Sequence, residues 1–196
     1  MVYAYLVKKD HKTNNALSKW QTELQTDLSG IWSFYCNVPF RCTSDVKLRW
    51  FQYKIINRIF PTNSLLLKMN LTDNNKCSFC EGSIESIEHL FFSCPCVQSL
   101  WRYVKGTLDD KGIKIFPADC ITILFGMKGD QTFNLILILI KYYIFLCKVN
   151  KTKLSVMHLK VFLKKYFDLQ KFIAISILNS EMWERYWLPW YNVFGL

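Results

Sequence analysis

The sequence has 196 residues, of which 51% are hydrophobic and 16% aromatic, with only seven Gly and five Pro. A chain of this composition forms a packed core, so a disordered or collagen-like protein is excluded. Its formal charge of +10 favours a polyanionic partner without saying which one. The charge is uneven: residues 31–76 and 111–180 are basic, whereas residues 77–110 are acidic and rich in cysteine.

The N-terminus and the cysteines together indicate the compartment. Lys8 and Lys9 follow a short apolar run, which is the reverse of the order in a secretory signal. We therefore expect an intracellular protein, either cytoplasmic or nuclear. In a reducing compartment, the eight cysteines are expected to bind metal or to be buried as thiols in preference to forming disulfides.

Apolar periodicity predicts a mainly α-helical chain, with slight strand content confined to the cysteine segment. Thr43, Ser44 and Asp45 supply N-cap chemistry for a helix that Pro61 ends. Residues 106–112 are expected to form a polar loop, and residues 116–125 are ambiguous between strand and helix. The predicted helices cover residues 13–29, 45–60, 63–69, 97–105, 131–148, 154–178 and 181–187.

The apolar run over residues 133–149 is near the lower length limit for crossing a bilayer. Lys141 falls near its middle, where a charge costs roughly 2.5–3.5 kcal/mol on insertion scales. We therefore predict a buried core helix that packs against the 154–178 helix and does not enter a membrane. Because burying an unpaired ammonium is costly, Lys141 is expected to reach the surface or an acidic partner.

One segment combines a close cysteine pair with a histidine and a further cysteine, in the pattern C-x2-C-x8-H-x4-C: Cys77, Cys80, His89 and Cys94. Zn²⁺ prefers such donors in a tetrahedron, and a site whose four positions are all filled by protein is structural. Cys96 is the alternative fourth ligand, although it lies beyond Pro95. Ordinary buried thiols are one competing interpretation. A redox Cys-x-x-Cys pair is the other, and it leaves His89 and Cys94 unexplained.

Several longer stretches accompany this spacing: Lys47-Leu-Arg-Trp-Phe-Gln-Tyr-Lys54, Arg58-Ile-Phe-Pro-Thr-Asn63, Glu88-His-Leu-Phe-Phe92 and Leu100-Trp101. With them, residues 16–104 resemble the zinc-binding region that follows the reverse transcriptase in LINE-type non-LTR retrotransposon polyproteins. Residues 141–147 and 161–165 are similar to the far C-terminal segment of the same polyproteins. The resemblance implies a helical domain with a small structural zinc-binding loop over residues 13–105. A helical C-terminal segment over residues 113–196 is expected to pack on this domain.

The sequence departs from that family in its catalytic motifs. The family polymerase carries a Tyr/Phe-x-Asp-Asp motif, whereas the only Asp-Asp pair in this chain is Asp109-Asp110, in a polar stretch. The endonuclease constellation is missing as well. We therefore expect no enzymatic activity, and the chain resembles the C-terminal part of such a polyprotein without its catalytic domains.

Two segments carry Lys and Arg at helical spacing with no Glu at i+4. Such a stripe is often only the solvated face of a helix, and the near absence of acidic residues supports the alternative of contact with phosphates. Trp50 and Tyr53, which lie in the first of these segments, could stack on unpaired bases, although aromatic residues at helical spacing are more often part of a core. The candidate nucleic-acid-binding residues are Lys47, Arg49, Lys54, Arg58, Lys153, Lys160, Lys164 and Lys171.

Two function hypotheses follow from these patterns. The first is a zinc-stabilised module that binds RNA or DNA, single-stranded and without strong sequence preference, for a reverse transcriptase. The upstream reverse transcriptase domains would be further partners, and no membrane is involved. The alternative is a zinc-stabilised protein–protein interaction module whose basic faces dock on another protein and do not contact nucleic acid.

Overall fold

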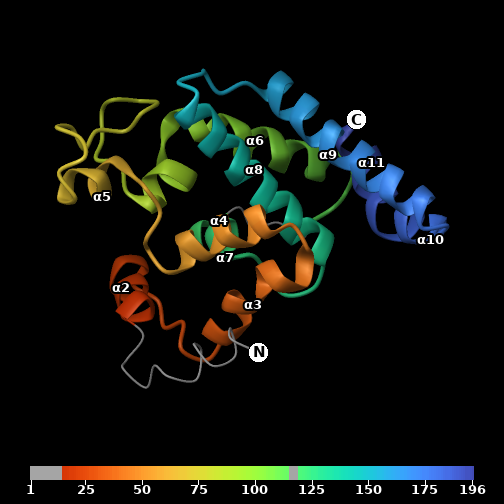
Figure 1. Cartoon of the computed structure of the whole chain (residues 1–196), viewed down its shortest axis with the longest axis horizontal. Coiled ribbons are helices and arrows are strands. Elements are labelled where there is room, and N and C mark those ends of the chain that lie inside the picture. The colour runs from red at the N-terminus through yellow and green to blue at the C-terminus, as the bar shows by residue number, and fades with distance from the viewer. Residues whose placement is uncertain (1–14, 115–118) are drawn as a thin grey trace.

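The computed structural model describes residues 15–114 and 119–196, and the predicted mainly α-helical fold is confirmed (Figure 1). No strand is present in these two ranges; Lys76 and Ile84 form an isolated antiparallel bridge in the cysteine segment. The helices before residue 100 are α2 (Asn15–Leu24), α3 (Trp32–Cys42), α4 (Val46–Ile56), α5 (Asn63–Lys68), the π-helix η1 (His89–Ser93) and the first turn of α6 (Pro95–Asp110). They are followed by α7 (Cys120–Phe125), α8 (Gln131–Val149), α9 (Val156–Ser176), α10 (Ser180–Met182), the π-helix η2 (Trp183–Trp187) and α11 (Leu188–Phe194).

Short polar side chains cap the start of several helices, and residues in the left-handed conformation follow the ends of several. Asp45 caps α4 by accepting hydrogen bonds from the Lys47 and Leu48 amides, at 2.8 and 3.4 Å. The predicted helices over 13–29 and 45–60 are shorter in the structure, ending at Leu24 and Ile56. Gln25 and Arg58 lie just beyond these ends with φ of 50° and 59°, a conformation that a helix cannot continue through.

The predicted polar loop over residues 106–112 is wrong, because α6 continues as far as Asp110. Val104 and Leu108 are both fully buried and continue the apolar stripe of α6 through this segment. On the solvent side of the same turn, Lys105 and Asp109 form an ion pair of 3.0 Å. The helix α3 has no counterpart among the predicted elements, since Pro39 lies inside it. Its inner side is nevertheless buried.

The apolar helix α8 runs through the middle of the fold and contacts α3, α4 and α9 (Figure 1). Contact with α9 agrees with the prediction for residues 131–148. By length and composition, α8 is the one helix in the described residues that could cross a membrane, and 72% of its apolar window is buried inside the protein. Such burial is typical of a core helix, and the absence of membrane insertion stays a prediction.

The prediction for Lys141 is wrong, because its side chain reaches neither the surface nor an acidic partner. Only 1% of the residue is exposed. Its ammonium donates hydrogen bonds to Gln52 Oε1 and to the Leu124 carbonyl oxygen, each at 2.7 Å. Gln52 is also buried and donates from Nε2 to the same carbonyl at 2.7 Å. Neutral oxygens therefore replace the expected carboxylate, and burial lowers the pKa of Lys141 to about 7.

Residues from both predicted segments share one hydrophobic core, and the predicted boundary between 105 and 113 stays a prediction. The C-terminal aromatic residues lie largely on this core: Trp183, Trp187 and Trp190 are buried, and Trp190 stacks on Phe133 with ring centroids 5.0 Å apart. The tail is fixed by a hydrogen bond of 3.1 Å from Trp190 Nε1 to Asp130 Oδ2.

The burial of Lys141 predicts an unusual pH dependence of stability. Between about pH 7 and 10 the unfolded chain keeps this proton while the folded chain releases it, so the free energy of unfolding rises with pH. The maximum slope is about 1.4 kcal/mol per pH unit. We expect Lys141→Met to lack this rise in urea unfolding measured at several pH values. Equal pH slopes for both proteins would contradict this assignment.

Candidate metal centre

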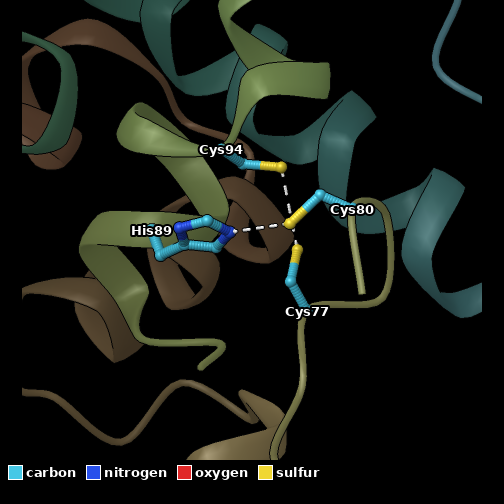
Figure 2. Close-up of side chains that lie close together, drawn as sticks. All are labelled: Cys77, Cys80, His89 and Cys94. Atoms are coloured by element: carbon cyan, nitrogen blue, oxygen red, sulfur yellow. Dashed lines mark hydrogen bonds between the residues drawn. The ribbon is translucent and has the colours of Figure 1, made fainter. Parts of the chain in front are cut away.

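Four side chains from three backbone segments point toward one another (Figure 2). Cys77 and Cys80 come from a turn, His89 from the start of η1, and Cys94 from the residue before α6. Their ligand atoms all lie within 4.8 Å of one another, and the structure thus brings together the four residues singled out in the sequence. The Sγ atoms of Cys77 and Cys94 are 3.7 Å apart, close to the ~3.8 Å separation of sulfurs around tetrahedral zinc.

The cysteine turn is held by its own backbone. The Cys77 amide donates to the Ser83 carbonyl at 2.8 Å, and the Glu81 amide donates to the Cys77 carbonyl at 3.0 Å. Glu81 has a φ of 56°, which reverses the chain after the second cysteine. The Phe79 amide faces Cys77 Sγ at 3.4 Å. These bonds place both thiols of the pair on the same side of the turn.

The wide turn of η1 explains how a four-residue gap brings His89 and Cys94 to one point. The Cys94 amide donates to the His89 carbonyl at 2.9 Å, an i−5 bond of the π-helical type. His89 Nδ1 lies 3.3 Å from Ser93 Oγ, and Nε2 lies 3.3 Å from Cys80 Sγ. With Nδ1 protonated and bonded to Ser93, Nε2 keeps its lone pair for a cation among the sulfurs.

The electrostatics of the three thiols differ. Burial raises the pKa of Cys77 and raises that of Cys94 to about 12. Burial acts in the same direction on Cys80, but hydrogen bonds to its sulfur, the largest from the Gly82 amide, outweigh it and lower the pKa of Cys80 to about 7. Backbone amides of Cys96 and Val97, at the start of α6, face Cys94 and favour its thiolate. The donor set therefore fits a cation that takes thiolates and one imidazole.

A buried carboxylate beside the cysteine turn was not found by sequence reasoning. Glu85 Oε2 accepts from the amide and hydroxyl of Ser78, at 2.8 and 2.7 Å, and Oε1 accepts from the Asn63 amide at 2.8 Å. Oε1 also accepts from Lys148 Nζ, at the end of α8, in an ion pair. Burial alone would raise the pKa of Glu85, but Lys148 and Ser78 outweigh it and hold the pKa below its usual value. Glu85 thus ties the cysteine turn to α5 and α8.

Cys96, the alternative fourth ligand, lies outside the cluster. It is exposed, and its Sγ is 3.6 Å from the Phe79 carbonyl oxygen. The structure therefore places Cys94 in the group and Cys96 beside it.

Several of the candidate nucleic-acid-binding residues have internal partners. Arg58 pairs with Glu23 and lies 4.2 Å from the centroid of the Trp20 ring, whereas Arg49 donates to the Thr43 carbonyl at 2.6 Å. The two basic segments contain no Glu at i+4, but an Asp occupies that position once, because Lys164 pairs with Asp168 at i+4, 3.4 Å away. The remaining members of the set are Lys47, Lys54, Lys153, Lys160 and Lys171, none of which has an ion pair within the described residues.

Residues 28–101 match the family model described as zinc-binding in reverse transcriptase. The match includes the four clustered ligands and Glu85, and it ends within α6. It supports over these residues the resemblance that the sequence motifs indicate, because this stretch is similar to the zinc-binding region of reverse transcriptases. The resemblance of residues 141–147 and 161–165 lies outside the match and stays a prediction.

The convergence of the four ligands predicts one metal ion per chain. Cys77→Ser together with Cys80→Ser removes two of the donors, so the variant is expected to lose the metal and to melt at a lower temperature. Cys96→Ser is the matched control and should keep one ion. Elemental mass spectrometry of the purified proteins measures the stoichiometry. Metal retained by the double variant, or lost by the control, would show that the ligands are wrongly assigned.

Proposed function

We propose that the chain is a non-catalytic, zinc-stabilised module that binds single-stranded RNA or DNA without strong sequence preference, inside the cell and beside a reverse transcriptase. The match over residues 28–101 supports the association with a reverse transcriptase. The formal charge of +10 supports a polyanionic partner. Three cysteines and one histidine support Zn²⁺ in a structural role, because they supply all four positions of a tetrahedron from protein.

The exposure of Trp50 is the observation that carries the nucleic-acid proposal. Of the seven tryptophans, six are buried in the core, whereas Trp50 is 53% exposed. Its ring stacks on that of Tyr53, with centroids 5.0 Å apart and 5° between the planes. Exposed aromatic rings are the surfaces on which proteins stack the unpaired bases of single strands.

The charges around Trp50 fit the same partner. Lys47 and Lys54 lie at i−3 and i+4 from Trp50, on one face of α4, and Lys54 Nζ is 5.7 Å from the Trp50 ring centroid. An aromatic ring between two cations can stack on an unpaired base while the cations contact the adjacent phosphates. A duplex hides its base faces, so this arrangement favours a single strand.

The end of α9 favours the second candidate, a protein-docking module. Phe172 is 68% exposed, and Ile175 and Leu178 are exposed near it in the sequence. Clusters of exposed apolar side chains mark protein contacts more often than nucleic-acid contacts. A folded, metal-loaded chain with no affinity for RNA or DNA at low salt would favour the docking function.

Removal of the Trp50 ring tests the stacking role. Trp50→Ala should weaken binding of a labelled single strand by about tenfold, because stacking on an aromatic ring contributes ~1–3 kcal/mol per base. Tyr186→Ala is the matched control, since Tyr186 is exposed to a similar extent on η2. Fluorescence anisotropy measures both affinities. An equal effect of the two substitutions would argue against stacking on Trp50.

Salt dependence tests the phosphate contacts. If about four phosphates are neutralised, log K should fall with log salt at a slope near −3 on a single strand. Lys47→Gln with Lys54→Gln should reduce the magnitude of this slope by about 1.4 and leave the metal content unchanged. A slope that stays the same in this double variant would remove the α4 lysines from the interface.

A further inference from the structure

A groove lies between the cysteine turn and the end of α8. Its volume is about 920 Å³, in the range of ligand pockets. The turn, the first part of α6 and the connection from α8 to α9 all contribute to its lining, which contains no acidic residue of the described chain. The lining includes Ser78, Phe79, Lys148, Lys151, Thr152 and Lys153.

The lining of the groove is positively charged. Lys148 is neutralised by the buried Glu85, and three thiolates with one divalent ion would leave a single negative charge at the adjacent metal centre. Lys151 and Lys153 are exposed and form no ion pair within the described residues. Within the described chain, the lining of the groove thus carries two ammonium groups without an ion pair and no carboxylate.

The backbone holds Lys151 at the groove in a conformation that favours glycine. Lys151 has a φ of 52° directly after the cap of α8. Its amide donates to the Lys148 carbonyl at 3.2 Å, and the Thr152 amide donates to the Cys147 carbonyl at 2.9 Å, which closes the helix end. A lysine in this backbone conformation destabilises the fold more than a glycine would. The backbone geometry alone would therefore favour glycine over a charged side chain at this position.

We propose that this groove binds the sugar–phosphate backbone of a single-stranded nucleic acid. Lys151 and Lys153 contact successive phosphates, the Thr152 hydroxyl donates to a phosphate oxygen, and the half-buried Phe79 ring packs on one unpaired base. The inference rests on the proposed function and gives the strand a second contact surface besides Trp50. It also places the metal centre in a positioning role, because Phe79 lies between two of its ligands.

The experiment uses the full metal-loaded chain and a fluorescein-labelled oligouridine of about 15 nucleotides, the upper range of single-strand site sizes. Lys151→Gln with Lys153→Gln should weaken binding by about tenfold or more at about 50 mM salt and reduce the magnitude of the salt slope by about 1.4. Lys19→Gln with Lys128→Gln is the control, because both lysines are exposed, lack ion pairs in the described chain and lie outside the groove. Its affinity should fall much less. A 4-thiouridine oligonucleotide should also crosslink to the peptide that contains Phe79.

The outcomes separate the groove from the function on which it rests. If the natural chain binds and the two double variants lose affinity equally, or if crosslinks form only outside the groove lining, the groove assignment is overturned and the nucleic-acid function stands. If the folded, metal-loaded natural chain does not bind the oligonucleotide at low salt, both are overturned. The metal content of each variant is measured as well, because it shows whether a loss of affinity results from loss of the metal centre.

Discussion

The cysteine segment has almost no apolar core of its own, and the arrangement around it depends on how this lack is compensated. Met69, Leu71 and Ile84 are exposed, so hydrophobic burial, to which Ile87 contributes, holds only part of the chain between α5 and η1. The convergence of three thiols and one imidazole supplies the missing constraint, and the buried Glu85 supplies a second one. The position of the cysteine turn then determines the position of the groove beside it.

Internal contacts engage several of the basic side chains, although the ion pairs leave the formal charge of +10 unchanged because that charge already counts their acidic partners. Lys148 neutralises Glu85, Arg58 pairs with Glu23, and Lys141 is buried with neutral oxygens. Lys141 and Lys148 belong to α8, outside residues 28–101, yet both bond to residues within or near that stretch. The C-terminal segment thus completes the polar interior of the zinc-binding region, and the remaining lysines define the surfaces open to a partner.

Short-range spacing predicted the features that local geometry determines. The gap between Cys77 and Cys80 indicates a chelating turn, and the apolar periodicity around α8 indicates a core helix. The buried polar bonds were beyond sequence reasoning because they join residues far apart in the chain: Lys141 with Gln52, 89 positions away, and Glu85 with Lys148, 63 positions away. Likewise, helical spacing cannot distinguish a lysine that faces solvent from one that contacts an acidic side chain or an aromatic ring of another helix.

The most direct test of the metal centre is X-ray absorption spectroscopy at the zinc edge on the purified, zinc-loaded chain. The account predicts four-coordinate zinc with three sulfur neighbours at about 2.3 Å and one nitrogen neighbour at about 2.0 Å. A first shell of four sulfurs, or one with fewer than three sulfurs and added oxygen neighbours, would contradict the assignment of the ligands. It would also remove the constraint that positions the cysteine turn.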